Sequence, residues 1–500
     1  MKGRVSLAVA IAAGAAIMAS ATTLAGDVRL TQISSDPFTN TTAIDGVAVF
    51  HQTEEEPDTF AFGSTIVSTF QVGRFHNGGA ADIGWATSTD GGRSWKHGFL
   101  PGTTFQPGVV DPNPLYERVS DASVAFDAKH GVWLISSIPL TSNLVVPTVF
   151  ISRSTDGLNW NDPVSIPQGS GPINLDKNWT VCDNSPTTPA GQPNRFYGNC
   201  YTEFDNFAKD DLELLSTSSD GGVTWSVPIS TPLHAHGLGG QPLVQPNGNV
   251  VVPFESIDTA GTIAAFGSMD GGQTLTNAVI ISGIDFHRVA GDLRTSPLPT
   301  AEIDGAGRVY VAWEDCHFEP GCPANDIVFS SSSDGVHWSG LSRVPGDAIG
   351  SGVDHFIPGL GVDKATSGSG AHLALTYYYY PNAACTVDTC QLNAAYISST
   401  NAGTSWGAPL QLAGPMNNKW LAFTTQGYMV GDYISTSILG SGQALTTIAV
   451  ASAGTAPDNL DEAMFAPSSP LAVSGGTVSS LQSAASTSSN LSFVVAPLSR

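Results

Sequence analysis

The feature that most constrains this 500-residue chain is a short motif that recurs along it. The complete form reads Ser-x-Asp-x-Gly-x-x-Trp; one copy has Asn for Asp, one has Leu for Trp, and two are one residue shorter. A repeat spaced by roughly 50 to 67 residues indicates one supersecondary unit stacked on copies of itself. The six copies begin at Ser88, Ser154, Ser218, Ser268, Ser332 and Ser399.

Each motif position suits a tight hairpin. The Asp or Asn oxygen accepts backbone N–H groups across a turn, Gly supplies positive φ, and Trp buries its ring against the hairpin. Residues 326–330 form a short strand before one motif, and residues 299–303 and 308–313 form two more upstream. With the strand after the motif, this makes four antiparallel strands, which is a propeller blade. The sequence predicts an all-β propeller.

Composition agrees with this fold and excludes some functions. The chain has 54 Gly and 32 Pro, and only 12% of its residues are charged, which favours many short strands over helices. Its net charge of −24 comes without a Lys/Arg cluster. Binding to a phosphate backbone needs such a cluster, so we expect no nucleic-acid partner.

The repeat resembles the BNR, or Asp-box, repeats of the sialidase-like β-propeller superfamily, over about residues 40 to 450. The resemblance implies that the motif aspartates are structural and lie away from the active-site face. Six motifs make six blades, as in true sialidases. Residues 428–436, 443–451 and 462–467 resemble three further strands, and residues 28–34 resemble an outer strand. We favour seven blades closed by this N-terminal strand, which would remove open edges, and keep six as the alternative.

We divide the chain into a signal peptide (residues 1–25), a propeller domain (26–467) and a Ser/Ala-rich C-terminal tail (468–500). Lys2 and Arg4 precede a short apolar run, as in secretory signals; the alternative is an uncleaved anchor. No later stretch is as long and apolar as a membrane span. We expect a secreted, monomeric protein.

The cysteines form three close pairs, which predict three local disulfides in an exported chain. Zinc is the weaker interpretation, because no pair has the two-residue spacing of a metal knuckle. His234 and His236 permit metal binding without requiring it, so we predict no metal and no cofactor. The pairs are Cys182/Cys200, Cys316/Cys322 and Cys385/Cys390.

The topology predicts where a ligand would bind. If each motif turns the third strand into the fourth, the opposite rim carries the starts of the innermost strands and the loops between second and third strands. Aligning the repeats places polar residues on that rim; the alternative is that these residues only cap neighbouring loops. The predicted catalytic residues are Glu56, Asp121, Glu203, Glu255, Tyr378 and Asp432, and the predicted substrate-binding residues are Arg74, Arg118, Arg288, Arg294 and His355.

The resemblance implies a sialidase site with three arginines, a Tyr–Glu nucleophilic pair and an Asp acid/base. By position, Arg74 and Arg294 would be two of the arginines and Tyr378 the nucleophile, with Glu203 or Glu255 as its partner. The Arg-Ile-Pro-like motif of sialidases is missing, and none of these residues sits in a matching motif.

Arg suits a carboxylate-bearing sugar. We therefore predict a glycoside hydrolase acting on an anionic glycan. The alternatives are a uronate polysaccharide lyase and a non-catalytic propeller that binds glycan or protein. An enzyme predicts that Arg74, Arg294, Tyr378 and one or two carboxylates meet in one pocket.

Overall fold

The structure of the chain is a computed structural model that describes residues 28–259, 261–454, 460–475 and 478–479. The predicted signal peptide lies outside these residues. The described part is all-β, as predicted, and its sheets are antiparallel. Within these ranges no helix is long and apolar enough to cross a membrane. The helical segments are short 3-10 turns at Phe207–Lys209, Gly368–Gly370 and Asn418–Trp420.

The commonest unit is a sheet of four antiparallel strands that pair in chain order, as the repeat predicts. Two units stand as separate sheets. Their strands are β10 (Leu175–Cys182), β11 (Cys200–Asn206), β12 (Leu212–Ser218) and β13 (Ile229–Ser230), then β19 (Thr300–Ile303), β20 (Val309–Asp315), β21 (Asp326–Ser332) and β22 (Ser342–Arg343).

The first two units are joined into one sheet through the pair Ala80 and Val119. Their strands are β2 (Glu54–Phe62), β3 (Thr65–Arg74), β4 (Ala80–Ser88) and β5 (Lys96–Phe99), then β6 (Arg118–Asp127), β7 (Val132–Leu140), β8 (Phe150–Ser154) and β9 (Val164–Ser165).

Two other units are slightly irregular. In one, the first strand is split into β14 and β15; in the other, the last two residues of the motif form a short strand, β26, which pairs with β34. The strands are β14 (Gly237–Leu238), β15 (Leu243–Val244), β16 (Val250–Ser256), β17 (Thr262–Ser268) and β18 (Val279–Gly283), then β23 (Asp354–Val362), β24 (Leu373–Tyr380), β25 (Leu392–Ser399), β26 (Ser405–Trp406) and β27 (Leu410–Met416).

Among the remaining strands, the first strand of the described residues pairs with one near residue 465. The N-terminal strand β1 pairs with β33, so the predicted pairing of the N-terminal strand beside C-terminal ones is confirmed. A hairpin formed by β28 and β29 comes directly before β30 along the chain. The bounds are β1 (Leu30–Gln32), β28 (Ala422–Thr424), β29 (Gly427–Met429), β30 (Thr436–Ile438), β31 (Ala444–Thr446), β32 (Ile448–Ala451), β33 (Glu462–Pro467) and β34 (Val478–Ser479).

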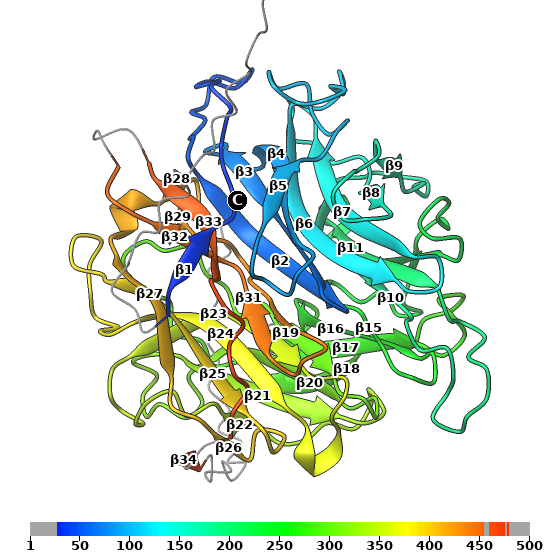
Figure 1. Cartoon of the computed structure of the whole chain (residues 1–500), viewed down its shortest axis with the longest axis vertical. Helices are drawn as coiled ribbons and strands as arrows, with labels where there is room; N and C mark the ends of the chain where they lie inside the picture. Colours follow the sequence, from blue (N-terminus) through cyan, green and yellow to red (C-terminus); the bar gives the residue numbers. More distant parts are fainter. Residues whose placement is uncertain (1–27, 260, 455–459, 476–477, 480–500) are drawn as a thin grey trace, which may run out of the picture.

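The first strands of the units surround a common centre (Figure 1). In turn, β2 contacts β6, β6 contacts β10, β10 contacts β15, β15 contacts β19, β19 contacts β23, β23 contacts β30, and β30 contacts β2. Phe62, at the end of β2, and the motif turn at Ser88 lie at one rim, because Phe62 pairs with Thr65 and Ile66 pairs with Ser88. The starts of the first strands form the other rim, here called the site rim.

In each copy of the motif the Ser and the Asp or Asn hold a turn with the same kind of hydrogen bonds, and the turn is one residue shorter in the two shorter copies. Asp90 Oδ1 accepts the backbone N–H groups of Arg93 (3.0 Å) and Ser94 (2.9 Å), while Ser88 Oγ accepts that of Gly92 (2.8 Å). The bonds to Ser94 lower the pKa of Asp90 to about 2. Such carboxylates are fully engaged in stabilising a turn. Equivalent bonds are accepted by Asp156, Asp220, Asp270, Asp334 and Asn401.

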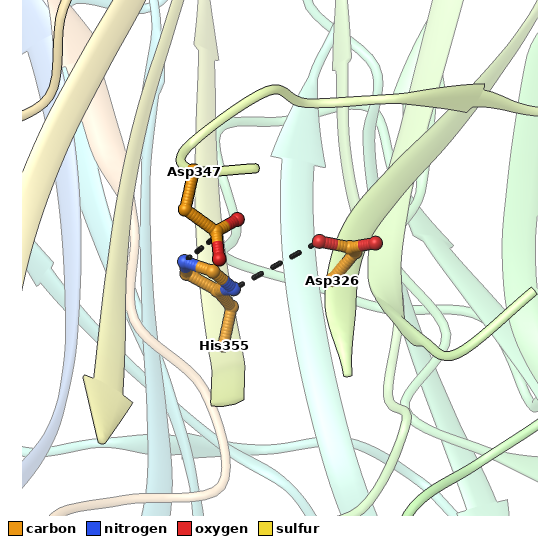
Figure 2. Close-up of side chains that lie close together, drawn as sticks. All are labelled: Asp326, Asp347 and His355. Carbon is orange, nitrogen blue, oxygen red and sulfur yellow. Dashed lines mark ion pairs between the residues drawn. The ribbon is translucent and has the colours of Figure 1, made fainter. Parts of the chain in front are cut away.

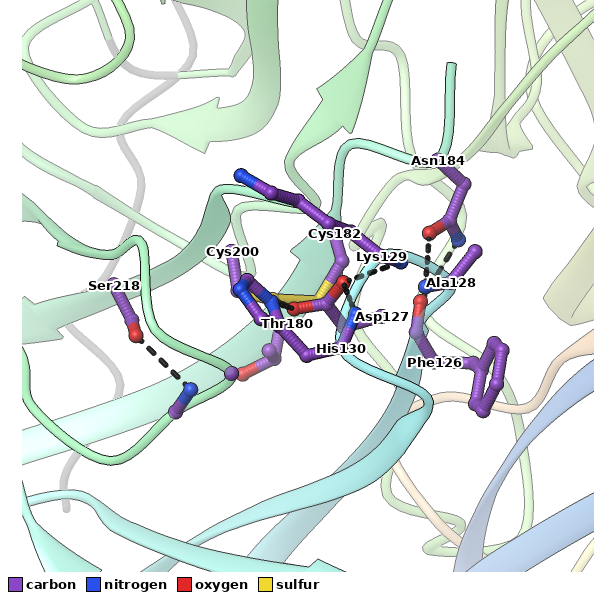
Figure 3. The surroundings of a disulfide bond; sticks show 12 residues. Phe126, Asp127, Ala128, Lys129, His130, Thr180, Cys182, Asn184, Cys200 and Ser218 are labelled. Carbon is purple, nitrogen blue, oxygen red and sulfur yellow. Dashed lines mark hydrogen bonds and ion pairs between the residues drawn. A yellow bond between two sulfur atoms is a disulfide. The ribbon is translucent and has the colours of Figure 1, made fainter. Parts of the chain in front are cut away.

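The three predicted disulfides are confirmed. Cys182–Cys200 joins directly paired residues of β10 and β11 at the motif rim, beside Asp127 (Figure 3). Cys316–Cys322 closes the β20–β21 loop and Cys385–Cys390 closes the β24–β25 loop, both on the site rim. Two of the bridges therefore restrain loops next to the predicted ligand face.

The first residues of the predicted tail are hydrogen-bonded. The Ser468 amide donates to Arg29 O, Leu471 and Ala444 exchange backbone bonds, and Ser474 bonds to Ser398. Leu471 is also buried. The domain boundaries at residues 25 and 467 stay predictions, but the chain just after residue 467 packs on the sheets.

Candidate functional site

Four of the first strands contain a β-bulge near the site rim. In each, a non-glycine residue takes positive φ: Glu56 (53°), Asp121 (51°), Lys177 (46°) and Ile357 (49°). Bulges re-aim side chains and are frequent next to active sites, and residues in this region of φ are strained and gather at functional sites. Three of these four residues carry ionisable side chains, and all three meet at one place.

Lys177 lies among three carboxyl groups. Its Nζ donates a hydrogen bond to Asp432 and lies 3.8 Å from Glu56 Oε1 and 4.0 Å from Asp121 Oδ2. Arg294 binds Asp432 from the other side, with Nε donating to Oδ1 at 2.6 Å and Nη2 donating to Oδ2. We call Glu56, Asp121, Lys177, Arg294 and Asp432 the lysine cluster.

Backbone and side-chain bonds connect the lysine cluster to Arg74. Asp432 N donates to Glu56 Oε1 at 3.0 Å, and Gln71 Nε2 donates to the other oxygen of Glu56. Arg74 Nη1 donates to Gln71 Oε1 at 2.7 Å, and its Nε lies 3.9 Å from Glu55. The arginine therefore supports the cluster through Gln71 rather than facing a ligand, since only 3% of its side chain is exposed.

The three carboxyl groups differ in protonation. Burial raises the pKa of Glu56 to about 8, with Asp432 and Asp121 adding to the rise and Lys177 opposing it. Burial also opposes ionisation of Asp121, but Lys177 outweighs it and the pKa of Asp121 is lowered. Arg294 and Lys177 likewise outweigh burial at Asp432 and hold its pKa far below the usual range. At neutral pH, Glu56 is an acid beside two carboxylates.

A small recess opens beside Lys177. Its lining includes Trp179, Gly240, Gln241 and Tyr433. The Trp179 and Tyr433 rings meet edge-on with centroids 5.2 Å apart. Aromatic rings beside charged groups offer both apolar and polar contacts to a ligand.

The exposed fractions of the side chains show which groups of the cluster a ligand would meet first. The Arg294 side chain is 19% exposed and that of Lys177 is 10% exposed, whereas the three carboxyl groups are at most 6% exposed. The cations therefore present the accessible surface of the cluster, and the carboxyl groups lie behind them.

The structure brings together five of the predicted site residues: Glu56, Asp121, Asp432, Arg294 and, through Gln71, Arg74. Lys177 and Tyr433 are not among the residues predicted from the sequence. The bulge in β10, between Asp176 and Trp179, aims Lys177 at the cluster. No local sequence pattern marks this bulge, so nothing singles out Lys177 from its neighbours.

Tyr378 lies outside the lysine cluster. It is fully buried, and its hydroxyl donates to Ala449 O at 2.9 Å, between β24 and β32. Burial raises the pKa of Tyr378, which holds the phenol neutral. Its predicted meeting with Arg74 and Arg294 in one pocket is not observed, because its side chain packs into the core.

Two of the predicted arginines lie elsewhere. Arg118 is fully buried, bonds to Asp45 (2.9 Å) and packs its guanidinium 4.5 Å from the Phe75 ring centroid. These contacts anchor a loop. Arg288 is exposed and follows His287, whose ring lies 3.7 Å from Asp354. Neither position brings the side chain into the lysine cluster.

Glu203 and Glu255 also lie away from the cluster. Glu203 is fully buried on β11, next to β12, which carries Glu213; burial and Glu213 raise the pKa of Glu203 well above the usual value. Gly240 covers it so closely that an added Cβ would lie 2.4 Å from the Glu203 carboxyl carbon. Burial raises the pKa of Glu255, on β16, to about 7.

His355 belongs to a separate group with Asp326 and Asp347 (Figure 2). Its two ring nitrogens lie 4.0 Å from one oxygen of each aspartate, a spacing at which a metal ion would fit. However, Arg343 Nη2 lies 2.6 Å from Asp326 and 2.5 Å from Asp347. Because this guanidinium already neutralises both carboxylates, the group fits a structural ion pair better than a metal centre.

Comparison with known proteins identifies similar chain paths but no family. No family model matches the chain, and no curated protein matches it. A Hadza microbial sialidase, Hz136, is 18% identical, covers 65% of this chain and 63% of its own, and has a TM-score of 0.44.

Two other solved structures are a PL25 ulvan lyase bound to -[GlcA(1-4)Rha3S]- and a Penicillium chrysogenum α-L-arabinanase complexed with arabinobiose. The lyase is 10% identical over 87% of this chain and 95% of its own, with a TM-score of 0.48. The arabinanase is 13% identical over 73% and 95%, with a TM-score of 0.44. Similarities at this level carry no argument about activity.

Proposed function

We propose that the chain is a secreted, seven-bladed, Asp-box β-propeller of the sialidase-like type that hydrolyses an anionic glycan at the lysine cluster. The closed ring of contacts through seven first strands, from β2 to β30 and back, supports seven blades over six. The pairing of β1 with β33 supports closure by the N-terminal strand. Three disulfides agree with export to an oxidising compartment.

The observation that carries the hydrolase proposal is the neutral Glu56 beside the ionised Asp121 and Asp432. Glycoside hydrolysis uses one protonated and one ionised carboxyl group, and different environments separate their pKa values. Both Glu56 and Asp121 lie within 4.0 Å of Lys177 Nζ. That proximity is compatible with the separations of about 5 to 9.5 Å that glycosidases use. Glu56 is the proposed general acid.

The proposed preference for an anionic sugar rests on Arg294 and Lys177. Arg294 already holds a carboxylate, Asp432, through two hydrogen bonds. A uronate or sialate carboxylate presents the same planar group, so it can compete for this guanidinium. Arg294 is also the most exposed residue of the cluster. We therefore place the substrate carboxylate at Arg294.

The residues favour hydrolysis over elimination. A uronate lyase needs a base such as Tyr or His to remove the α-proton. The tyrosine of the recess, Tyr433, donates its hydroxyl to Ala122 O at 3.3 Å. Burial and the nearby Glu56 raise its pKa well above the usual value. A phenol held in its neutral form is a poor base at neutral pH.

A non-catalytic glycan-binding propeller is the second candidate. The observation that favours it is that Glu56 is fully buried and its oxygens accept bonds from Asp432 N and Gln71. In this function the carboxyl groups hold the rim together, and Arg294 and Lys177 bind the ligand.

Turnover and binding of sialosides and uronate oligosaccharides by the wild type, Glu56→Gln and Arg294→Ala distinguish these functions. Glu56→Gln should lower kcat by about 10²-fold or more with little change in binding, while Arg294→Ala should weaken binding. Glu255→Gln, a control outside the cluster, should leave turnover unchanged. Binding of these glycans by the wild type without turnover would favour the non-catalytic glycan-binding propeller. Absence of both would exclude a glycan function.

A further inference from the structure

We infer that the β28–β29 hairpin and the β3–β4 loop form a sugar-stacking subsite beside the lysine cluster. We call its three rings, His76, Phe423 and Tyr428, the aromatic shelf. The inference rests on the proposed function and deepens it: the substrate is an oligosaccharide or polysaccharide whose next sugar lies on the shelf, rather than a single terminal sugar.

The three rings are in direct contact. The Phe423 and Tyr428 ring centroids are 4.9 Å apart at an interplanar angle of 55°, and those of His76 and Phe423 are 6.0 Å apart at 38°. Phe423 remains 45% exposed, and His76 and Tyr428 are half-buried. The shelf is therefore a continuous aromatic surface rather than one isolated exposed ring.

Hydrogen bonds hold the hairpin on both sides. Toward the β3–β4 loop, the Thr425 amide donates to His76 O at 2.9 Å and His76 Nδ1 lies 2.7 Å from Phe423 O. Toward residues 292–294, the Tyr428 amide donates to Asp292 O at 2.8 Å. Gly427 packs so closely there that an added Cβ would lie 2.3 Å from Asp292 O. A surface held this firmly loses little freedom when a ligand stacks on it.

The shelf is continuous with the lysine cluster along the chain. The Arg294 amide donates to Tyr428 O at 2.7 Å, and Asp432 lies four residues after Tyr428, with bends at Val430 and Asp432. On the other side of the shelf, His76 follows Arg74 by two residues. The shelf therefore adjoins the cluster, where a neighbouring sugar of a bound chain would lie.

His76 adds two ring nitrogens, and the hydrogen bond that Nδ1 makes shows which of them donates and which accepts. A carbonyl oxygen only accepts hydrogen bonds, so Nδ1 carries the proton that points at Phe423 O. In the neutral ring, Nε2 is then an acceptor for a sugar hydroxyl. Two apolar rings with an acceptor at their edge match a pyranose, which presents C–H groups on its face and hydroxyls around its rim.

The test uses the wild-type chain and three variants: Phe423→Ala, Phe423→Leu and Phe62→Ala. Phe62 is the matched control, because it is 44% exposed but lies at the motif rim. Isothermal titration calorimetry measures binding of oligogalacturonates of one to six units and of α2,8-linked oligosialic acids of one to five units. Thermal unfolding confirms that each variant folds.

We expect Phe423→Ala and Phe423→Leu to weaken binding of the longer oligomers by about tenfold and to leave monosaccharide affinity unchanged. Phe62→Ala should bind like the wild type. Equal affinity of the wild type and Phe423→Ala for every length would overturn the shelf and leave the proposed function standing. A wild type that binds neither series, at any length, would overturn both.

Discussion

Lys177 controls the charge of the three carboxyl groups around it. It lowers the pKa of Asp121 and Asp432, which stay ionised, and it only partly offsets the effect of burial on Glu56. Arg294 and Lys177 together keep Asp432 ionised, and Lys177 keeps Asp121 ionised, beside one neutral acid. Proton transfer to a leaving group requires a protonated acid close to ionised carboxylates. Their different environments hold the pKa values of these groups apart.

The pH dependence of activity follows from Glu56. Because its pKa is about 8 and the protonated form is the proposed acid, kcat/KM should fall as pH rises through about 8. Lys177→Met removes the charge that lowers this pKa, so the basic limb should move to higher pH. Initial rates of the wild type and this variant between pH 5 and 10 measure the shift; an unmoved limb would argue against Glu56 as the acid.

Among the structural elements, the motif turn recurs along the chain, and its copies differ in how far the tryptophan side chain is buried. Trp225 and Trp406 are buried, and their indole N–H groups donate to the carbonyls of Gly222 (3.3 Å) and Gly403 (3.1 Å). Trp160, in one of the shorter copies, is only half-buried, and its indole nitrogen has no partner among the described residues. Trp95, in a full-length copy, is likewise half-buried with no partner for its indole nitrogen among the described residues, so burial of the ring differs from copy to copy and does not follow the length of the motif.

Truncation of these rings should therefore have unequal costs. Trp225→Ala and Trp406→Ala each remove a buried ring and should lower the free energy of unfolding by roughly 3–5 kcal/mol. Trp160→Ala should cost clearly less, because its ring already meets solvent. Urea unfolding of the three variants compares them. Equal losses would show that the burial of the ring does not set its contribution to stability.

At the scale of the whole molecule, the notable property is the number of buried carboxyl groups with raised pKa values. Burial raises the pKa of Asp82 to about 8, and of Asp58, Glu255 and Asp354 to about 7. They lie on several sheets, so the effect is spread through the structure. Their neutral forms reduce the repulsion expected from a net charge of −24.

The protein should therefore be more stable in mild acid than in mild base. Between about pH 4.5 and 8 the unfolded chain has released protons that the folded chain still holds, so the free energy of unfolding falls as pH rises. Below about pH 4 the trend reverses, because turn aspartates such as Asp90, with its pKa near 2, become protonated. Thermal melting should give a higher Tm at pH 5 than at pH 8. A Tm that rises toward pH 8 would contradict the raised pKa values of these buried carboxyl groups.

The features that sequence predicts best here are local. The motif turn is held by bonds within a few residues, as between Asp90 and Ser94, and the disulfides join cysteines close in sequence, such as Cys385 and Cys390. The antiparallel units follow from strands separated by short turns. The rim that carries the site follows from the same topology, which is why Glu56, Asp121 and Asp432 could be named together.

What the tertiary structure decided is the direction of each side chain. Lys177 enters the cluster because a bulge adds a residue to β10 and shifts the alternation of faces, which no local pattern announces. Tyr378 turns into the core, and Arg118 and His355 find partners of opposite charge or apolar rings, through contacts between segments far apart in sequence. The sequence by itself determined the repeat, its turns and the rim of interest. Long-range packing decided which charged groups meet there, because burial and pairing depend on neighbours that only contacts between distant strands bring together.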